Sequence, residues 1–275
     1  MTHSKKHLGQ NFLKSEAALR KIVEVGEVGS SDVVLEIGPG RGALTARLLE
    51  KAGVVVAVEK DDELIEFLNE KFETEIKNKK LILINADVLE FNINGAILTF
   101  GDGLGIVSED LSKSLKLRSY KIIANIPYNI TGAILKKFLT EEKQPERMIL
   151  MLQQEVAQRI VARDNKESIL SISVKAYGTP KMEMKVPARY FSPAPKVDSA
   201  VISIKNISRG VFRKSGIQEE LFWQIVKKGF AHKRKKLSSN IKSMLKNADN
   251  SVLANLGNKR AEDLTLAEWI LLAKA

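Results

Sequence analysis

The chain contains no cysteine and only three histidines among its 275 residues. Without thiols it can form no disulfide, no thiolate metal site and no cysteine nucleophile. Three scattered histidines also argue against a histidine-based metal centre or a catalytic triad. We therefore expect chemistry without a metal ion.

Long apolar runs are absent as well. No run approaches the roughly 20 residues that a membrane-spanning helix needs, and the first six residues, MTHSKK, lack the apolar core of a signal peptide. With 44% hydrophobic and 28% charged residues, the composition is typical of a globular protein with a substantial core. These features predict a cytoplasmic protein, and we expect a monomer with no membrane contact.

Acidic residues are scarce in one stretch of an otherwise balanced chain. The net charge is +11, yet residues 205–246 alone contain 12 Lys and Arg against 2 Asp and Glu. Residues 1–204 contain 29 against 27. Because the positive charge is confined to one region, it indicates a polyanionic partner more than a generally basic surface.

The sequence pattern also changes near residue 205. Before it, β-rich runs alternate with helical spacing, beginning with residues 32–37, a glycine turn at 38–42 and leucines at helical spacing. After it, apolar residues recur only at helical spacing. We predict an α/β fold with a doubly wound Rossmann-like sheet in residues 1–205 and a small all-α domain in residues 206–275.

Polar or glycine residues end four successive predicted strands. Gly38 and Gly40 follow the first, Glu59 ends the second about 20 residues later, Asp87 follows the third and Asn125 ends the fourth. Each could be an ordinary turn, cap or solvated charge. Because the carboxyl ends of parallel strands meet at one edge of a sheet, the four together predict a nucleotide-binding site in which Glu59 accepts ribose hydroxyls.

Asn125 opens the segment Asn125-Ile126-Pro127-Tyr128. The asparagine offers an amide, Pro127 keeps Ile126 extended, and Tyr128 supplies a flat face with a polar tip. Such a rigid elbow suits a planar amine-bearing substrate such as a nucleobase. The alternative is a strand-to-helix turn with a structural asparagine.

Two other stretches bear on function. Phe191 precedes Ser192-Pro193-Ala194-Pro195, and two prolines would hold an exposed ring in place at low entropic cost, although a phenylalanine beside prolines can also be a core residue. Six basic residues lie within ten positions, and they favour phosphate contacts over a merely solvated face: Lys227, Lys228, Lys233, Arg234, Lys235 and Lys236. Residues 95–118 interrupt the α/β pattern as an excursion of unknown purpose.

These motifs together resemble the ribosomal RNA adenine dimethyltransferases, in particular the bacterial type that acts on small-subunit RNA. The resemblance runs from His7 to the C-terminus. Its carriers are HLGQNFL at 7–13, EIGPGRG at 36–42, Val58-Glu59, Ala86-Asp87, NIPYN at 125–129 and FSPAPKVDS at 191–199. The excursion at 95–118 is longer than is usual for this family.

The resemblance implies a class I methyltransferase that uses S-adenosylmethionine, held by Asn11, Leu13, Gly38, Glu59, Asp87 and Asn125. It implies N6-dimethylation of two neighbouring adenosines near the 3′ end of the small-subunit RNA, in an immature ribosomal subunit. Asn125 and the backbone at Ile126 or Pro127 would hold the adenine amine, while Tyr128 and Phe191 would stack on the extruded base.

Three alternatives remain at this point. The sister family that methylates large-subunit RNA has the same pocket motifs, although residues 259–269 resemble the small-subunit branch. A non-catalytic assembly factor would not need Glu59, Asp87 or the segment 125–128. A small-molecule methyltransferase would not need the basic region.

Overall fold

The computed structural model describes residues 10–91, 119–241, 252 and 255–274. Residues 7–9 of the N-terminal motif and the excursion at 95–118 lie outside them. The chain divides into two compact units, one of residues 1–154 and 181–205, the other of residues 155–180 and 206–275. The second unit thus includes 155–180, which the sequence analysis placed in the first domain. No helix in the described ranges is long and apolar enough to cross a membrane.

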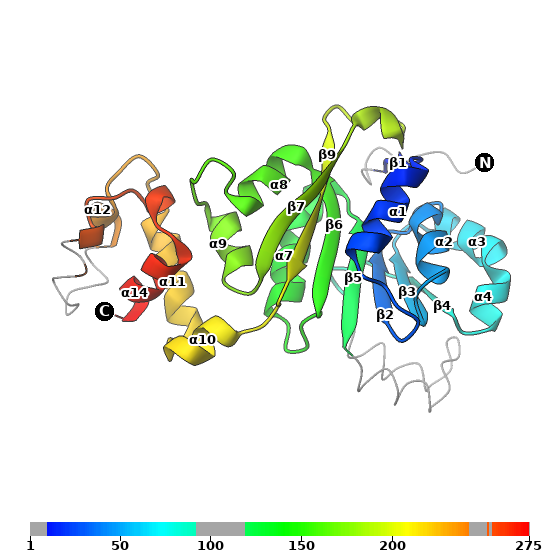
Figure 1. Ribbon diagram of the computed structural model, residues 1–275, viewed down its shortest axis with the longest axis horizontal. Coiled ribbons are helices and arrows are strands. Elements are labelled where there is room, and N and C mark those ends of the chain that lie inside the picture. Colours follow the sequence, from blue (N-terminus) through cyan, green and yellow to red (C-terminus); the bar gives the residue numbers. More distant parts are fainter. Residues whose placement is uncertain (1–9, 92–118, 242–251, 253–254, 275) are drawn as a thin grey trace. The chain divides into compact units, whose positions relative to one another are not determined.

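The first unit is built on a seven-stranded sheet with the order β4-β3-β2-β5-β6-β9-β7 (Figure 1). The strands from β4 to β6 are parallel, and β9 runs antiparallel to β6. This confirms the predicted α/β class. The strand bounds are β2 Val33–Ile37, β3 Val54–Glu59, β4 Leu81–Asn85, β5 Tyr120–Asn125, β6 Arg147–Gln153, β7 Thr179–Val186 and β9 Ser199–Lys205.

The central strands are apolar on both faces, as expected of parallel strands covered by helices on both sides. Every residue of β2 and β3 is buried. On one face, Val34, Val55 and Ile123 join a core cluster with Leu19 and Leu48 from two helices. The helices in the described part of this unit are α1 Glu16–Val25, α2 Ala43–Leu49, α3 Asp62–Lys71, α4 Glu73–Lys77 and α7 Thr131–Thr140.

A second, two-stranded sheet joins the N-terminal segment to the predicted Phe191 loop. Here β1 (Phe12–Leu13) pairs antiparallel with β8 (Phe191–Ser192). The helix α1 begins directly afterwards, with Ser15 as its N-cap, since the Ser15 side chain accepts a hydrogen bond from the N–H of Ala18 at 3.3 Å.

The described part of the second unit is helical. Its aromatic packing is tight at Gly229, where a Cβ would lie 2.3 Å from the Trp269 ring. Phe230 stacks on the same ring with centroids 5.5 Å apart. The helices are α8 Gln154–Val161, which begins at the unit boundary, then α9 Ile169–Lys175, α10 Gly210–Ser215, α11 Glu219–Gly229, α12 Leu237–Ile241 and α14 Leu266–Lys274.

Candidate active site

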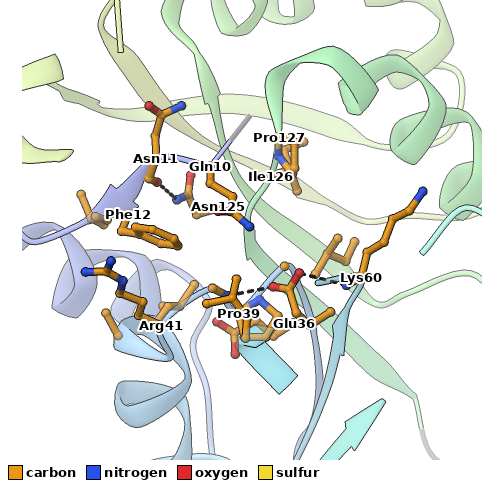
Figure 2. Close-up of a pocket in the computed structure, with 18 of the residues that line it drawn as sticks. Gln10, Asn11, Phe12, Glu36, Pro39, Arg41, Lys60, Asn125, Ile126 and Pro127 are labelled. Carbon is orange, nitrogen blue, oxygen red and sulfur yellow. Dashed lines mark hydrogen bonds between the residues drawn. The ribbon is translucent and has the colours of Figure 1, made fainter. Parts of the chain in front are cut away.

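A cavity of about 670 Å³ lies at the carboxyl ends of β2, β3, β4 and β5. That volume falls within the range of small-molecule sites. Figure 2 shows part of its lining, with Asn11, Glu36, Lys60 and Asn125 around it. Most of the predicted site residues line this one cavity: Asn11, Leu13, Gly38, Gly40, Glu59, Asp87, Asn125, Pro127 and Tyr128.

The glycine turn between β2 and α2 leaves room for a ligand at Gly38. Its φ is +64°, which favours glycine, and an added Cβ would meet nothing within 4 Å. A side chain there would thus occupy cavity space. At Gly42 a side chain is excluded by packing, since its φ is +72° and a Cβ would lie 2.4 Å from the Phe72 ring.

Glu59 is buried and largely held by backbone N–H groups. Its Oε1 accepts from Lys60 at 2.9 Å and Asp61 at 3.0 Å, and its Oε2 accepts from Gly40 at 3.1 Å. Burial raises the pKa of Glu59, and these three donors oppose that rise. Since a carboxylate has about four acceptor positions, this arrangement leaves roughly one for a ligand hydroxyl.

Asp87 presents a carboxylate to the same cavity. It accepts from Lys60 Nζ at 2.8 Å and from the N–H of Leu89 at 2.9 Å. The hydrogen bond from Lys60 is the main reason that the pKa of Asp87 lies below its usual value. Asp87 is therefore an ionised acceptor, the form that can bind an amino group.

Asn125 has a defined amide orientation. Its Nδ2 donates to the carbonyl of Asn11 at 3.1 Å, drawn as a dashed line in Figure 2. That bond determines which end of the Asn125 amide is the nitrogen, because only the nitrogen can donate to a carbonyl. Its Oδ1 has no donor among the described residues and stays available as an acceptor in the cavity wall.

The backbone after Asn125 supplies a second acceptor. The carbonyl of Pro127 accepts the N–H of Ile130 at 3.3 Å, whereas the described residues place no donor at the carbonyl of Ile126. Of the two backbone candidates, Ile126 thus has the more available oxygen.

The ring of Tyr128 is fixed in position by a hydrogen bond. Its hydroxyl hydrogen-bonds to the Ser199 hydroxyl on β9 at 2.7 Å. Burial raises the pKa of Tyr128, and the bond to Ser199 opposes this rise. The phenol therefore stays protonated at neutral pH, with its ring fixed by β9.

The prediction of an exposed ring at Phe191 is wrong. Phe191 is only 3% exposed and belongs to the core cluster. Its backbone pairs with Leu13, and its large apolar surface is removed from water on the core side of that pairing. The next residue, Ser192, lines the cavity in its place. Stacking of Phe191 on a base would require the ring to leave this core.

Sequence reasoning overlooked Glu36, which precedes the glycine turn and lines the cavity. It is 1% exposed, and its Oε2 has no hydrogen-bond partner within the described ranges. Burial raises the pKa of Glu36 to about 8. Its position inside an otherwise apolar buried strand is the signal that could have identified it.

This buried carboxyl predicts a pH-dependent stability. The unfolded chain releases the Glu36 proton near pH 4.5, whereas the folded chain keeps it up to about pH 8. Between these values the folded state binds more protons, so its stability falls as pH rises. Glu36→Gln removes this titration. The free energy of unfolding of the variant minus that of wild type should therefore increase by roughly 2–4 kcal/mol from pH 5 to pH 9.

Urea unfolding at pH 5, 7 and 9 measures this difference. Glu66, an exposed residue of α3, is the matched control, because Glu66→Gln removes a solvated carboxylate. A gap between Glu36→Gln and wild type that stays constant with pH would contradict the raised pKa.

The six basic residues predicted to bind RNA are all exposed and lie in the second unit. Lys227 and Lys228 are in the last turn of α11, and the other four lie in the turn at 231–236, here called the basic turn. Buried Asn240 fixes this turn, since its Nδ2 donates to the carbonyls of Gly229 at 2.6 Å and His232 at 3.2 Å. The basic turn thus presents its charges on an ordered backbone.

The strand order with the reversed strand β9, the glycine turn and the acidic strand ends define a Rossmann-like class I methyltransferase. Comparison with protein families gives the same answer. The family described as ribosomal RNA adenine dimethylase matches residues 1–275, and this chain belongs to that family. It is therefore an enzyme, an rRNA adenine dimethyltransferase.

Relatives from several bacteria match almost the whole chain. Ribosomal RNA small subunit methyltransferase A of Francisella tularensis subsp. novicida is 37% identical, covering 99% of this chain and 97% of its own. The protein of that name from Dehalococcoides mccartyi is 35% identical, covering 98% and 87%.

Solved structures resemble the fold over both units. A dimethyladenosine transferase from Plasmodium falciparum matches with a TM-score of 0.75 at 24% identity, covering 95% of this chain and 96% of its own. The 23S rRNA methyltransferase ErmE matches with 0.72 at 22% identity, covering 96% and 98%. At these identities the likeness concerns the fold alone.

Proposed function

We propose that this enzyme transfers methyl groups from S-adenosylmethionine to N6 of two adjacent adenosines near the 3′ end of 16S ribosomal RNA during ribosome biogenesis. The observation that carries the proposal is the orientation of Asn125. Because its nitrogen donates to Asn11, its oxygen is a fixed acceptor, and the next residue, Ile126, lines the same cavity with a carbonyl that accepts from no described residue. Two acceptors on consecutive residues match in number the two N–H bonds of an adenine amino group.

The other cavity residues fit an adenosine-bearing methyl donor. Glu59 has acceptor capacity for a ribose hydroxyl, and Asp87 can accept from the donor's adenine amine. Gly38 leaves the backbone open to close approach, and Asn11 and Leu13 line the wall formed by the N-terminal segment. S-adenosylmethionine, when bound, supplies an electrophilic methyl group.

The chain's own contribution is orientation. An adenine amine is a poor nucleophile, because its lone pair is delocalised into the ring. Hydrogen bonds to Asn125 and Ile126 would fix both N–H bonds and direct the lone pair toward the methyl group. The alkylated nitrogen is acidic enough to lose its proton to water, so the mechanism requires no strong base and no metal. In the first methylation the amine has two N–H bonds, one for each acceptor. In the second methylation the monomethylated amine has only one N–H bond left to donate.

The basic turn would position the substrate RNA through its phosphates, without reading sequence. The partner is then the small-subunit RNA within an immature ribosomal subunit, bound by a monomer of this chain. The small-subunit names of the relatives at 35–37% identity favour this target over large-subunit RNA.

Incubation with labelled S-adenosylmethionine tests the proposal, with unmethylated small and large subunits in separate reactions and modified nucleosides identified by mass spectrometry. Dimethyladenosine only in small-subunit RNA is the expected result. Label in large-subunit RNA would show that the substrate is large-subunit RNA. Tight binding of the small subunit without label in either RNA would make the chain an assembly factor.

Tyr128 should act through its ring and not its hydroxyl. Tyr128→Ala removes the stacking plate, and since stacking contributes about 1–3 kcal/mol per base, methyl transfer should fall about 10- to 100-fold. Tyr128→Phe loses only the bond to Ser199 and should stay within about threefold of wild type. Single-turnover rates with saturating donor measure both. Equal losses in the two variants would instead assign the hydroxyl the leading role.

A further inference from the structure

The N-terminal segment, whose Asn11 carbonyl accepts the hydrogen bond from Asn125, is attached to α3 by Gln10, a residue that was not among the predicted site residues. The N-terminal segment, residues 10–14, is fixed beyond Asn11 by the pairing of β1 with β8 and by the N–H of Lys14, which donates to the carbonyl of Tyr190 at 2.8 Å. On the other side of Asn11, Gln10 Nε2 donates to Asp61 Oδ2 at 2.8 Å. The Asn11 carbonyl therefore lies between two anchors.

Asp61 is a firm attachment point. It is 4% exposed, it caps α3 by accepting the N–H of Glu63 at 3.2 Å, and its own N–H donates to Glu59. A continuous chain of bonds thus runs from Glu59 through Asp61 and Gln10 to the peptide that holds Asn125. It joins the end of the cavity predicted to hold the ribose with the end predicted to hold the target amine.

We infer that Gln10 is a positioning residue, which fastens the N-terminal segment to α3 so that the Asn11 carbonyl keeps the Asn125 amide in its reactive orientation. The inference rests on the proposed function of Asn125. If the bond from Gln10 to Asp61 is lost, the segment at Asn11 loses this attachment, and the Asn125 amide can rotate away from the amine. Because small misplacements of reacting groups are costly, the rate should fall even with donor saturating.

The substitution Gln10→Glu keeps the length of the side chain but sets a carboxylate against Asp61. We expect a roughly tenfold fall in the single-turnover rate of the first methylation and a several-fold weaker affinity for S-adenosylhomocysteine. The double variant Q10E/D61N restores a hydrogen bond of reversed direction, and the amide oxygen at 61 still caps α3. Both readouts should recover toward wild type.

Asn85 offers a matched control. Its Nδ2 donates to Oδ1 of Asp62, the residue after Asp61, at 2.8 Å. Asn85→Asp therefore sets a carboxylate against a carboxylate in the same way, in an exposed pair of residues that are not among those lining the cavity. Rate and affinity should stay at wild-type values. A merely structural effect of charge repulsion at this helix start would appear in both variants alike.

Gln10→Glu with wild-type rate and affinity would overturn the inference, as would a double variant that fails to recover while its unfolding midpoint equals that of wild type. Wild-type enzyme that forms no dimethyladenosine would overturn the proposed function instead. In that event the affinity for S-adenosylhomocysteine still reports on the anchor separately.

Discussion

Replacing Asn125 with alanine should lower the rate of methyl transfer at least about 100-fold, because a fixed acceptor for the reacting amine disappears. The variant also loses the bond to Asn11. Asn125 lines the same cavity as the other residues predicted to bind S-adenosylmethionine. The affinity for S-adenosylhomocysteine should therefore fall as well, but less than about tenfold. Binding to the small subunit, which we assign to the second unit, should not change.

Asn125→Asp sharpens this experiment. Aspartate keeps the shape and an acceptor oxygen, but its second oxygen faces the Asn11 carbonyl where the amide had donated. We expect it to be as slow as the alanine variant, since the amide works through a defined orientation. Quench-flow with a saturating donor separates the rate from binding. Turnover of either variant within threefold of wild type would contradict the proposed role.

The sequence was sufficient for the sheet and for the residues at the strand ends that line the cavity, for a physical reason. Gly38 and Asp87 come just after short parallel strands, and Glu59 and Asn125 end two others, so the parallel register alone brings the four residues to one edge of the sheet. Fold and lining follow from local patterns repeated along the chain.

Phe191 and Gln10 show what such patterns cannot supply. Whether a phenylalanine beside prolines faces solvent depends on which strand pairs with it, here β1 from the other end of the first unit. The bond from Gln10 to Asp61 spans 51 residues and has no periodicity to reveal it. Glu36 is similar, since only three-dimensional burial shows that its carboxyl lacks a partner. Contacts between segments far apart in the sequence, by pairing for Phe191 and Gln10 and by burial for Glu36, decided these cases.

Replacing Lys233, Arg234, Lys235 and Lys236 together by glutamine should weaken binding to small-subunit RNA about 100-fold or more at low salt. The four side chains are exposed on a turn fixed by Asn240, so their loss removes charge without removing core packing. Phosphate contacts release counterions, and the slope of log affinity against log salt should become shallower by up to about 3 for single-stranded RNA. The two proteins should therefore converge in affinity at high salt.

Net charge alone could produce part of this effect, and a second quadruple variant tests for it. Arg20, Lys51, Lys136 and Lys185 are exposed residues of the first unit, and changing them to glutamine lowers the net charge by the same amount. If general attraction dominated, both variants would lose affinity alike. If the basic turn makes the contacts, the control should lose less than about threefold and keep the wild-type salt slope.

The consequence for catalysis distinguishes this variant from the Asn125 variants. Because the basic turn would contact phosphates and not the reacting amine, the quadruple variant should methylate at nearly the wild-type rate once RNA is saturating. Its deficit should thus appear in KM, whereas that of Asn125→Ala should appear in kcat. A quadruple variant with wild-type affinity at every salt concentration would contradict RNA binding by the basic turn while leaving the active-site assignment intact.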